Sequence, residues 1–75
     1  MTNGEILSVQ MANFKRELNV AIQRKAKKMV VIHGVGEGTL KSEIHLELYN
    51  HYPNMEFHDA NYRKYGYGAT EIILR

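Results

Sequence analysis

The stretch from Met29 to Leu40 constrains the fold of this 75-residue chain more than any other. It begins with four consecutive apolar residues, Met29–Ile32, a run rich in β-branched side chains that predicts a strand buried on both faces. A histidine and alternating glycines follow: His33, Gly34, Gly36 and Gly38. Because glycine tolerates positive φ and lets a partner approach the backbone closely, this segment predicts a loop.

A helix is predicted after the last glycine, because apolar residues recur there at every fourth position: Leu40, Ile44, Leu48 and Tyr52. Pro53 ends this pattern. A strand, a glycine loop and a helix in succession direct backbone N–H groups and the positive end of the helix dipole at one point, which suits a phosphate. The G-x-G-x-G spacing is neither the dinucleotide nor the P-loop pattern. A tight turn that needs glycines for packing explains the same residues, so both interpretations stay open.

The length and composition predict one small domain, covering residues 1–75, with a thin core. The chain has no cysteine, no apolar run of the roughly 20 residues that a membrane span needs, and no basic signal segment. We therefore expect a cytoplasmic protein with no membrane contact, no metal site and no cofactor. We also expect the domain to be part of a longer protein.

The formal net charge is +2, and most basic residues precede the glycine loop. Six of them lie in the first predicted helix or at its end: Lys15, Arg16, Arg24, Lys25, Lys27 and Lys28. A basic face beside a phosphate-binding loop favours nucleic acid over a small substrate. Ordinary solvation of a helix face, and the complement that lysines give to a helix dipole, explain these charges equally well.

The remaining elements are predicted from local patterns. An amphipathic helix is expected from about Glu5 to Lys28, with Asn3 as its N-cap and its last one or two residues unwound. Alternating polarity predicts a half-buried strand over Met55–Asp59, and Ala69–Leu74 reads as the last strand, so these two form a hairpin. The predicted order is α-β-α-β-β, which indicates the α/β class.

Two histidines lie on the second predicted helix, His45 and His51. They are six residues apart and therefore diverge by about 240° around the helix. Converging metal ligands need a different spacing. We interpret both as ordinary surface or boundary histidines.

The connection between the last two strands is unusually long and mixes aromatic and basic residues: Tyr62, Arg63, Lys64, Tyr65 and Tyr67. Bases stack on aromatic rings while cations contact phosphates, so this composition favours single-stranded nucleic acid. Packing of one or two tyrosines back onto the sheet would reduce the exposed apolar area. Both interpretations stay open.

The segment from Val30 to Lys41 resembles the signature of the Smr domain, the small MutS-related domain. In that family a hydrophobic strand ends in an H-G-x-G loop, and a small-x-Leu-Arg/Lys segment opens the next helix. Six positions match: His33, Gly34, Gly36, Gly38, Leu40 and Lys41. Gly68-Ala69-Thr70 is similar to the G-x-T segment before the family's last strand.

This resemblance implies a small two-layer α/β sandwich, similar to the C-terminal domain of translation initiation factor 3. It also implies binding of DNA or RNA, and in some members nicking of branched or single-stranded substrates. The family begins with a strand carrying a Leu-Asp-x-His type motif, implicated in cleavage, and Ile6–Val9 lacks both its Asp and its His. His33 is thus left without an evident acidic partner for general acid–base catalysis. An unpaired sheet edge would also remain, which predicts weak self-association.

We therefore expect a nucleic-acid-binding module. The resemblance and the loop composition together give its contact residues: His33, Gly34, Gly36, Gly38, Lys41, Tyr62, Arg63, Lys64 and Tyr65. One alternative is an endonuclease with His33 as acid or base, and the other is a protein-interaction module without catalysis. Whether the chain is an enzyme stays open at this point.

Overall fold

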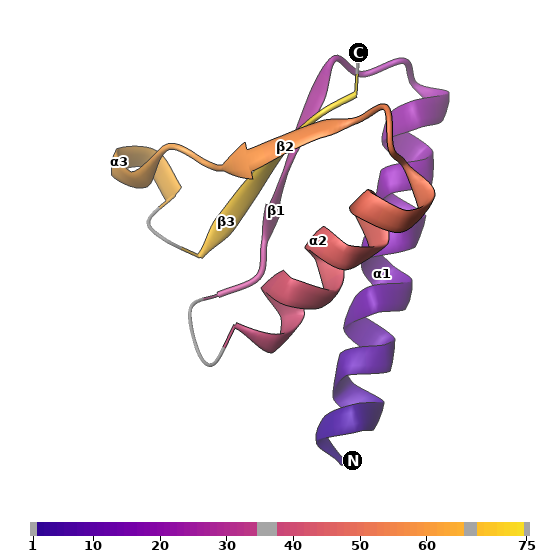
Figure 1. Cartoon of the computed structure of the whole chain (residues 1–75), viewed down its shortest axis with the longest axis vertical. Helices are drawn as coiled ribbons and strands as arrows, with labels where there is room; N and C mark the ends of the chain where they lie inside the picture. The colour runs from indigo at the N-terminus through magenta and orange to yellow at the C-terminus, as the bar shows by residue number, and fades with distance from the viewer. Residues whose placement is uncertain (1, 35–37, 66–67, 75) are drawn as a thin grey trace.

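The computed structural model describes residues 2–34, 38–65 and 68–74 of the chain. Its elements are, in order, α1 (Asn3–Gln23), β1 (Lys28–Ile32), α2 (Thr39–His51), β2 (Glu56–Asp59), α3 (Tyr62–Tyr65) and β3 (Ala69–Ile73), as Figure 1 shows. This order confirms the predicted succession of elements and adds the short helix α3 between the last two strands. The protein is a small α/β fold.

The three strands form one antiparallel sheet in the order β1-β3-β2, so the last strand of the chain lies at the centre. Thr70 of β3 is paired with Val31 of β1 on one side and with Asp59 of β2 on the other. The carboxyl ends of β1 and β2 therefore meet the amino end of β3. This end of the sheet receives both the segment after His33 and the segment before Gly68.

The two long helices pack against one face of the sheet and give the fold its two layers (Figure 1). Six buried side chains form the core between the layers: Phe14, Leu18, Val31, Ile44, Leu48 and Ile72. Each side chain of this kind contributes about 1.5–3 kcal/mol when it is fully buried. This apolar strip fixes both helices on the sheet and thereby fixes where α2 begins.

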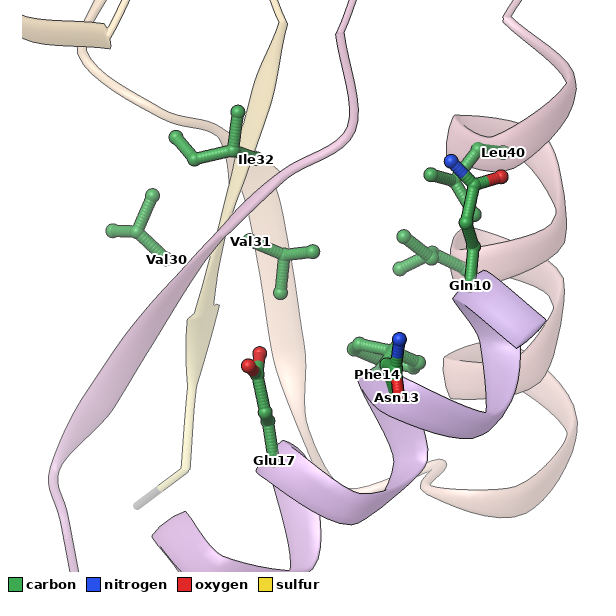
Figure 2. Close-up of a pocket in the computed structure, with 9 residues that line it drawn as sticks. Gln10, Asn13, Phe14, Glu17, Val30, Val31, Ile32 and Leu40 are labelled. Atoms are coloured by element: carbon green, nitrogen blue, oxygen red, sulfur yellow. The ribbon is translucent and has the colours of Figure 1, made fainter. Parts of the chain in front are cut away.

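The prediction that the first strand is buried on both faces is wrong. Side chains alternate between the faces of a strand, and here the helices cover one face only. Figure 2 shows Val31 pointing toward Phe14 of α1, with Val30 and Ile32 on the opposite side. Ile32 is 65% exposed. A four-residue apolar run thus forms a strand with only one face covered in this domain. The uncovered face also carries an ion pair, in which the His58 Nε2 lies 3.2 Å from the Glu71 carboxylate.

Helix α1 begins earlier and ends earlier than predicted. Its N-cap is Thr2 rather than Asn3. The Thr2 hydroxyl accepts from the Glu5 amide at 3.1 Å, and the Glu5 carboxylate accepts from the Thr2 amide at 2.9 Å. This reciprocal pair is a capping box, which satisfies two of the amides that a helix start leaves unpaired.

The carboxyl end of α1 unwinds by five residues rather than by one or two, since the helix ends at Gln23. The Lys25 amide donates to the Ile22 carbonyl, and the Ala26 amide donates to the Ala21 carbonyl, both at 3.0 Å. This pattern is a Schellman motif, in which the residue after the C-cap is left-handed and usually glycine. Here that residue is Lys25, with φ of 59°.

The predicted hairpin is confirmed, since β2 and β3 pair antiparallel. Its connection is not simply a loop, because it contains the single helical turn α3. The side chain of Asn61 accepts from the backbone amides of Arg63 and Lys64 at 2.9 and 3.3 Å, which caps that turn. Tyr67, the third tyrosine of this connection, lies outside the described residues.

A search of the described residues for a membrane-spanning helix finds none with the required length and apolarity.

The left-handed lysine gives the first prediction. A non-glycine residue with positive φ carries a steric cost on the order of 1–2 kcal/mol. We expect Lys25→Gly to raise the free energy of unfolding by about 0.5–1 kcal/mol, because the gain is partly offset by the freer unfolded chain. Urea unfolding followed by circular dichroism measures this. Lys25→Ala is the matched control, since it removes the charge but keeps the Cβ, and a similar gain in that variant would contradict the steric explanation.

Candidate functional site

The two glycine-containing segments that the sequence singles out meet at the end of the sheet. The Gly68 carbonyl accepts from the backbone amides of both His33 and Gly34, at 2.8 and 3.0 Å. A Cβ on Gly68 would lie 2.9 Å from the Gly34 Cα, closer than real Cβ contacts come. Glycine at position 68 therefore allows this contact, which fastens the end of β1 to the start of β3.

His33 leaves β1 at this junction and uses both of its ring nitrogens within the domain. Nδ1 is 2.9 Å from the Gly34 carbonyl oxygen, in an exposed contact. Nε2 is 2.9 Å from the Thr70 hydroxyl, in a partly buried one. The side of the ring that carries Nδ1 is thus the side that a ligand can reach, while the Nε2 side faces the interior.

The Thr70 hydroxyl also contacts a second histidine. The His45 Nε2 lies 2.9 Å from the same oxygen, and the His45 ring packs on Phe57 with centroids 4.7 Å apart. Thr70 is completely buried. The two imidazole rings are edge to face with centroids 6.5 Å apart. Two histidines from different elements therefore share one buried hydroxyl.

The sequence did not predict a role for His45 beyond that of a surface or boundary residue. It does lie at the boundary, half-buried, and His51 is exposed and pairs with Glu47 at 3.0 Å. The signal that could have identified His45 is its position four residues after Lys41, on the same side of the helix. Its partner Thr70 comes from the far end of the chain, which no local pattern reveals.

Lys41 pairs with an acidic residue at the mouth of the site. Its ammonium lies 2.9 Å from the Asp59 carboxylate. The hydrogen bond from Lys41, together with its charge, lowers the pKa of Asp59 below its ordinary value. The charges of His45 and His33 act in the same direction. Asp59 is thus an acidic neighbour of both histidines, one that the sequence did not reveal for His33.

The environment of His45 opposes its protonation. Burial is the main reason why the pKa of His45 lies below the ordinary value, and the positive charges of Lys41 and His33 add to it. The Asp59 carboxylate acts against this shift, though less strongly. The neutral form of His45 is therefore favoured in the folded protein.

The amino end of α2 opens at the same place. Gly38, the N-cap, has φ of 79° and provides no side chain to the first-turn amides. Its own carbonyl accepts from the Ser42 amide. Gly36 lies outside the described residues, and the Gly34 amide is already bonded to Gly68. Among the described residues, no side chain caps the first turn of α2.

Arg63 and Lys64 lie on α3, which connects β2 to β3 at the same end of the sheet as His33 (Figure 1). Both are exposed. The His33 cluster and α3 thus lie at the same end of the sheet, reached from different strands. Tyr62 and Tyr65 belong to the same turn, but their side chains lie outside the described part of the structure, so their predicted role stays a prediction.

A groove of about 390 Å³ lies elsewhere, along the outer edge of β1. Its walls come from α1, β1 and α2, and Figure 2 shows Gln10, Asn13 and Glu17 rising from α1 on one side of it. None of the contacts described above for His33 belongs to this groove. Among the described residues, no group of three or more His, Asp or Glu side chains is arranged to hold a metal ion.

Together these features define a small two-layer α/β domain with a histidine just after the edge strand β1, in contact with the central strand β3. The family model of the Smr domain matches residues 7–75, so the chain belongs to the Smr domain family. No curated protein and no solved structure matches the chain. The similarity to the C-terminal domain of translation initiation factor 3 therefore stays a prediction.

The lowered pKa of His45 gives the second prediction. A group whose pKa is lower in the folded state than the ordinary 6.5 binds fewer protons there than in the unfolded chain. Stability is then fully present above that value and is lost as the pH falls below it. We expect the free energy of unfolding to decrease between about pH 7 and about pH 5, and His45→Gln to reduce this decrease. Urea unfolding at a series of pH values measures both, and an unchanged slope in His45→Gln would contradict the assignment.

Proposed function

We propose that this Smr domain binds nucleic acid at the end of the sheet where His33, the start of α2 and α3 lie. Membership of the family is consistent with nucleic-acid binding or with endonuclease activity. The observation that carries the proposal is that the His33–Gly34 segment is bonded to Gly68, while the His45–Thr70 and Lys41–Asp59 contacts bring α2 to the same end of the sheet. An uncapped helix start attracts phosphate through its amides and dipole.

In this proposal a phosphate contacts the first turn of α2, where Gly38 leaves open space around the backbone. Gly36, the other glycine predicted to contact it, lies outside the described residues. His33 contributes through Nδ1, since a phosphate oxygen can replace the exposed Gly34 carbonyl as the acceptor of that hydrogen. Lys41 adds positive charge, which it shares with Asp59 at 2.9 Å. The Gly34 amide remains with Gly68 and keeps the loop in place.

The second part of the proposed surface is α3. Arg63 and Lys64 contact the phosphates of a strand, and the composition of this turn keeps Tyr62 and Tyr65 as the sequence-predicted residues for stacking on its bases. The exposure of the two cations and the position of α3 at the same end of the sheet support this. Stacking of each base is worth about 1–3 kcal/mol in single-strand binding.

A second candidate function is cleavage of nucleic acid, and one observation favours it. The site gathers a carboxylate, two imidazoles and an ammonium group around one buried hydroxyl. Such groups carry out general acid–base catalysis when one of them reaches the reacting atom. In this candidate His33 is the acid or base, since its Nδ1 side is accessible.

Binding is tested by NMR titration of the labelled domain with a short single-stranded oligonucleotide and with a branched duplex, at two salt concentrations. We expect shifts in His33, Gly38, Lys41 and the α3 residues, decreasing as salt rises. Gel analysis of the same mixtures tests for cleavage. Absence of shifts with both ligands at low salt would contradict the proposal and favour a protein-interaction module.

A matched pair of charge removals sharpens this third prediction. Arg63→Gln removes a proposed phosphate contact, and Arg24→Gln removes an equal charge at the C-cap of α1, near the opposite end of the sheet. We expect Arg63→Gln to lower the slope of log affinity against log salt by about 1. Arg24→Gln should leave that slope unchanged, and an equal effect of both variants would indicate only a general charge effect.

We also propose that the open edge of β1 supports weak self-association. Within the described sheet β1 pairs with β3 on one side only, and its Val30 and Ile32 lie on the uncovered face. An edge of this kind presents unpaired backbone groups to another strand.

The fourth prediction follows from this edge. Sedimentation over a range of protein concentrations is expected to show a rising average mass for the wild-type domain. Ile32→Lys is expected to lower it, because a charge on an edge strand disfavours pairing and the 65% exposed side chain is not needed in the core. A mass that does not depend on concentration would rule out this proposal.

A further inference from the structure

The shared Thr70 hydroxyl links the two histidines in a way that depends on where their protons lie. The Gly34 carbonyl can only accept, so the His33 Nδ1 beside it carries a hydrogen. In neutral His33 the other nitrogen, Nε2, is therefore bare. It accepts from the Thr70 hydroxyl, whose oxygen in turn accepts from the Nε2–H of His45.

Adding one proton reverses the direction of both hydrogen bonds made by the Thr70 hydroxyl. A charged His33 donates through Nε2 to Thr70, so the hydroxyl turns and donates to the Nε2 of His45. That nitrogen must then be bare, and His45 carries its hydrogen on Nδ1. In balance, one proton is gained at the His45 Nδ1, the Nε2 proton passes to the Thr70 oxygen, and the hydroxyl proton passes to His33.

A second proton is not accommodated. With both rings charged, both Nε2–H groups point at one oxygen, and the buried hydroxyl hydrogen loses each of its two imidazole acceptors. A buried polar group without a partner costs about 1–3 kcal/mol. Two positive rings with centroids 6.5 Å apart also repel each other. The hydrogen-bonding pattern around the Thr70 hydroxyl therefore has room for one added proton on the two rings but not for two.

The surrounding groups disfavour a positive charge on His45. From its own helix, Lys41 faces His45, and from β2 Asp59 faces both Lys41 and the imidazoles. The carboxylate of Glu71, on β3, points to the other face of the sheet and pairs with His58. Burial and the lysine disfavour charge on His45, while the Nδ1 side of His33 is exposed.

We propose that His33, Thr70 and His45 form a single-proton relay in which His45 is a positioning residue that controls the charge of His33 at the nucleic-acid surface. One consequence of the relay rests on the proposed function: binding a phosphate at the Nδ1 side of His33 draws one proton into the relay. The relay itself is a property of the free domain. Affinity for nucleic acid then rises as the pH falls through the titration of the pair, by up to tenfold for each pH unit.

The relay is tested first in the free protein, by long-range proton–nitrogen NMR of the histidine rings over a pH series. We expect His45 to change from the Nε2–H to the Nδ1–H form with the same midpoint as the protonation of His33. His45 keeping its Nε2–H form throughout would overturn the proposal. So would independent charging of both rings.

Two substitutions separate the relay from simple packing. Thr70→Val keeps the shape of the side chain and removes the hydroxyl, so we expect the change in His45 to lose its coupling to His33. Thr70→Ser keeps a hydroxyl and should restore the coupling. If Thr70→Val proves too unstable, the wild-type and Thr70→Ser titrations still decide the matter, since uncoupled rings in both would contradict the relay.

The functional consequence is tested by calorimetry of the single-stranded oligonucleotide in buffers of different ionisation enthalpy. We expect uptake of up to one proton on binding near neutral pH. His33→Gln should abolish the uptake, whereas Arg63→Gln should weaken binding and leave the uptake unchanged. Binding without proton uptake would overturn the proposed consequence. Absence of binding would instead contradict the proposed function, and the ring titration would still test the relay.

Discussion

The contact that the rest of the site depends on is the one between the Gly68 carbonyl and the amides of His33 and Gly34. It joins the end of the edge strand β1 to the start of the central strand β3. Because Thr70 follows Gly68 by two residues, the same contact places the His33 ring over the Thr70 hydroxyl. A side chain on Gly68 would force these backbones apart, so the geometry of the histidine follows directly from a glycine 35 positions along the chain.

Local patterns predict the elements of this fold well because their causes are local. The four-residue period from Leu40 to Leu48 reflects one buried stripe, and Pro53 closely follows the end of the helix that it was expected to stop. The ends of α1 were predicted less well. At the amino end, both Thr2 and Asn3 are suitable N-cap residues, and the sequence alone does not choose between them. At the carboxyl end, no glycine marks the left-handed position, which Lys25 occupies within a run of basic residues.

Only part of the site could be predicted, because some of its residues are adjacent in the sequence and others meet only in the folded chain. His33 and Lys41 stand in a contiguous motif, so a single stretch of sequence identifies them. Asp59 and Thr70 become neighbours of these residues only through the register of the β2–β3 pair. His45 then joins them because α2 lies on the face of the sheet toward which Thr70 points. Pairing register between distant strands is a tertiary property, and no periodicity in the sequence encodes it.

The distribution of charge in the site links its structure to its proposed use. Lys41, the cation best placed beside the start of α2, is already held by Asp59 at 2.9 Å, so it offers a ligand less than a full positive charge. Burial, Lys41 and His33 together disfavour charge on His45. The exposed cations of α3 lie at the same end of the sheet. Since the net charge of the whole chain is only +2, long-range attraction is modest, and in the proposed relay the added proton supplies further positive charge at this end of the sheet. The buried Thr70 hydroxyl keeps an imidazole partner whichever way its hydrogen points, so the added proton leaves this buried polar group hydrogen-bonded.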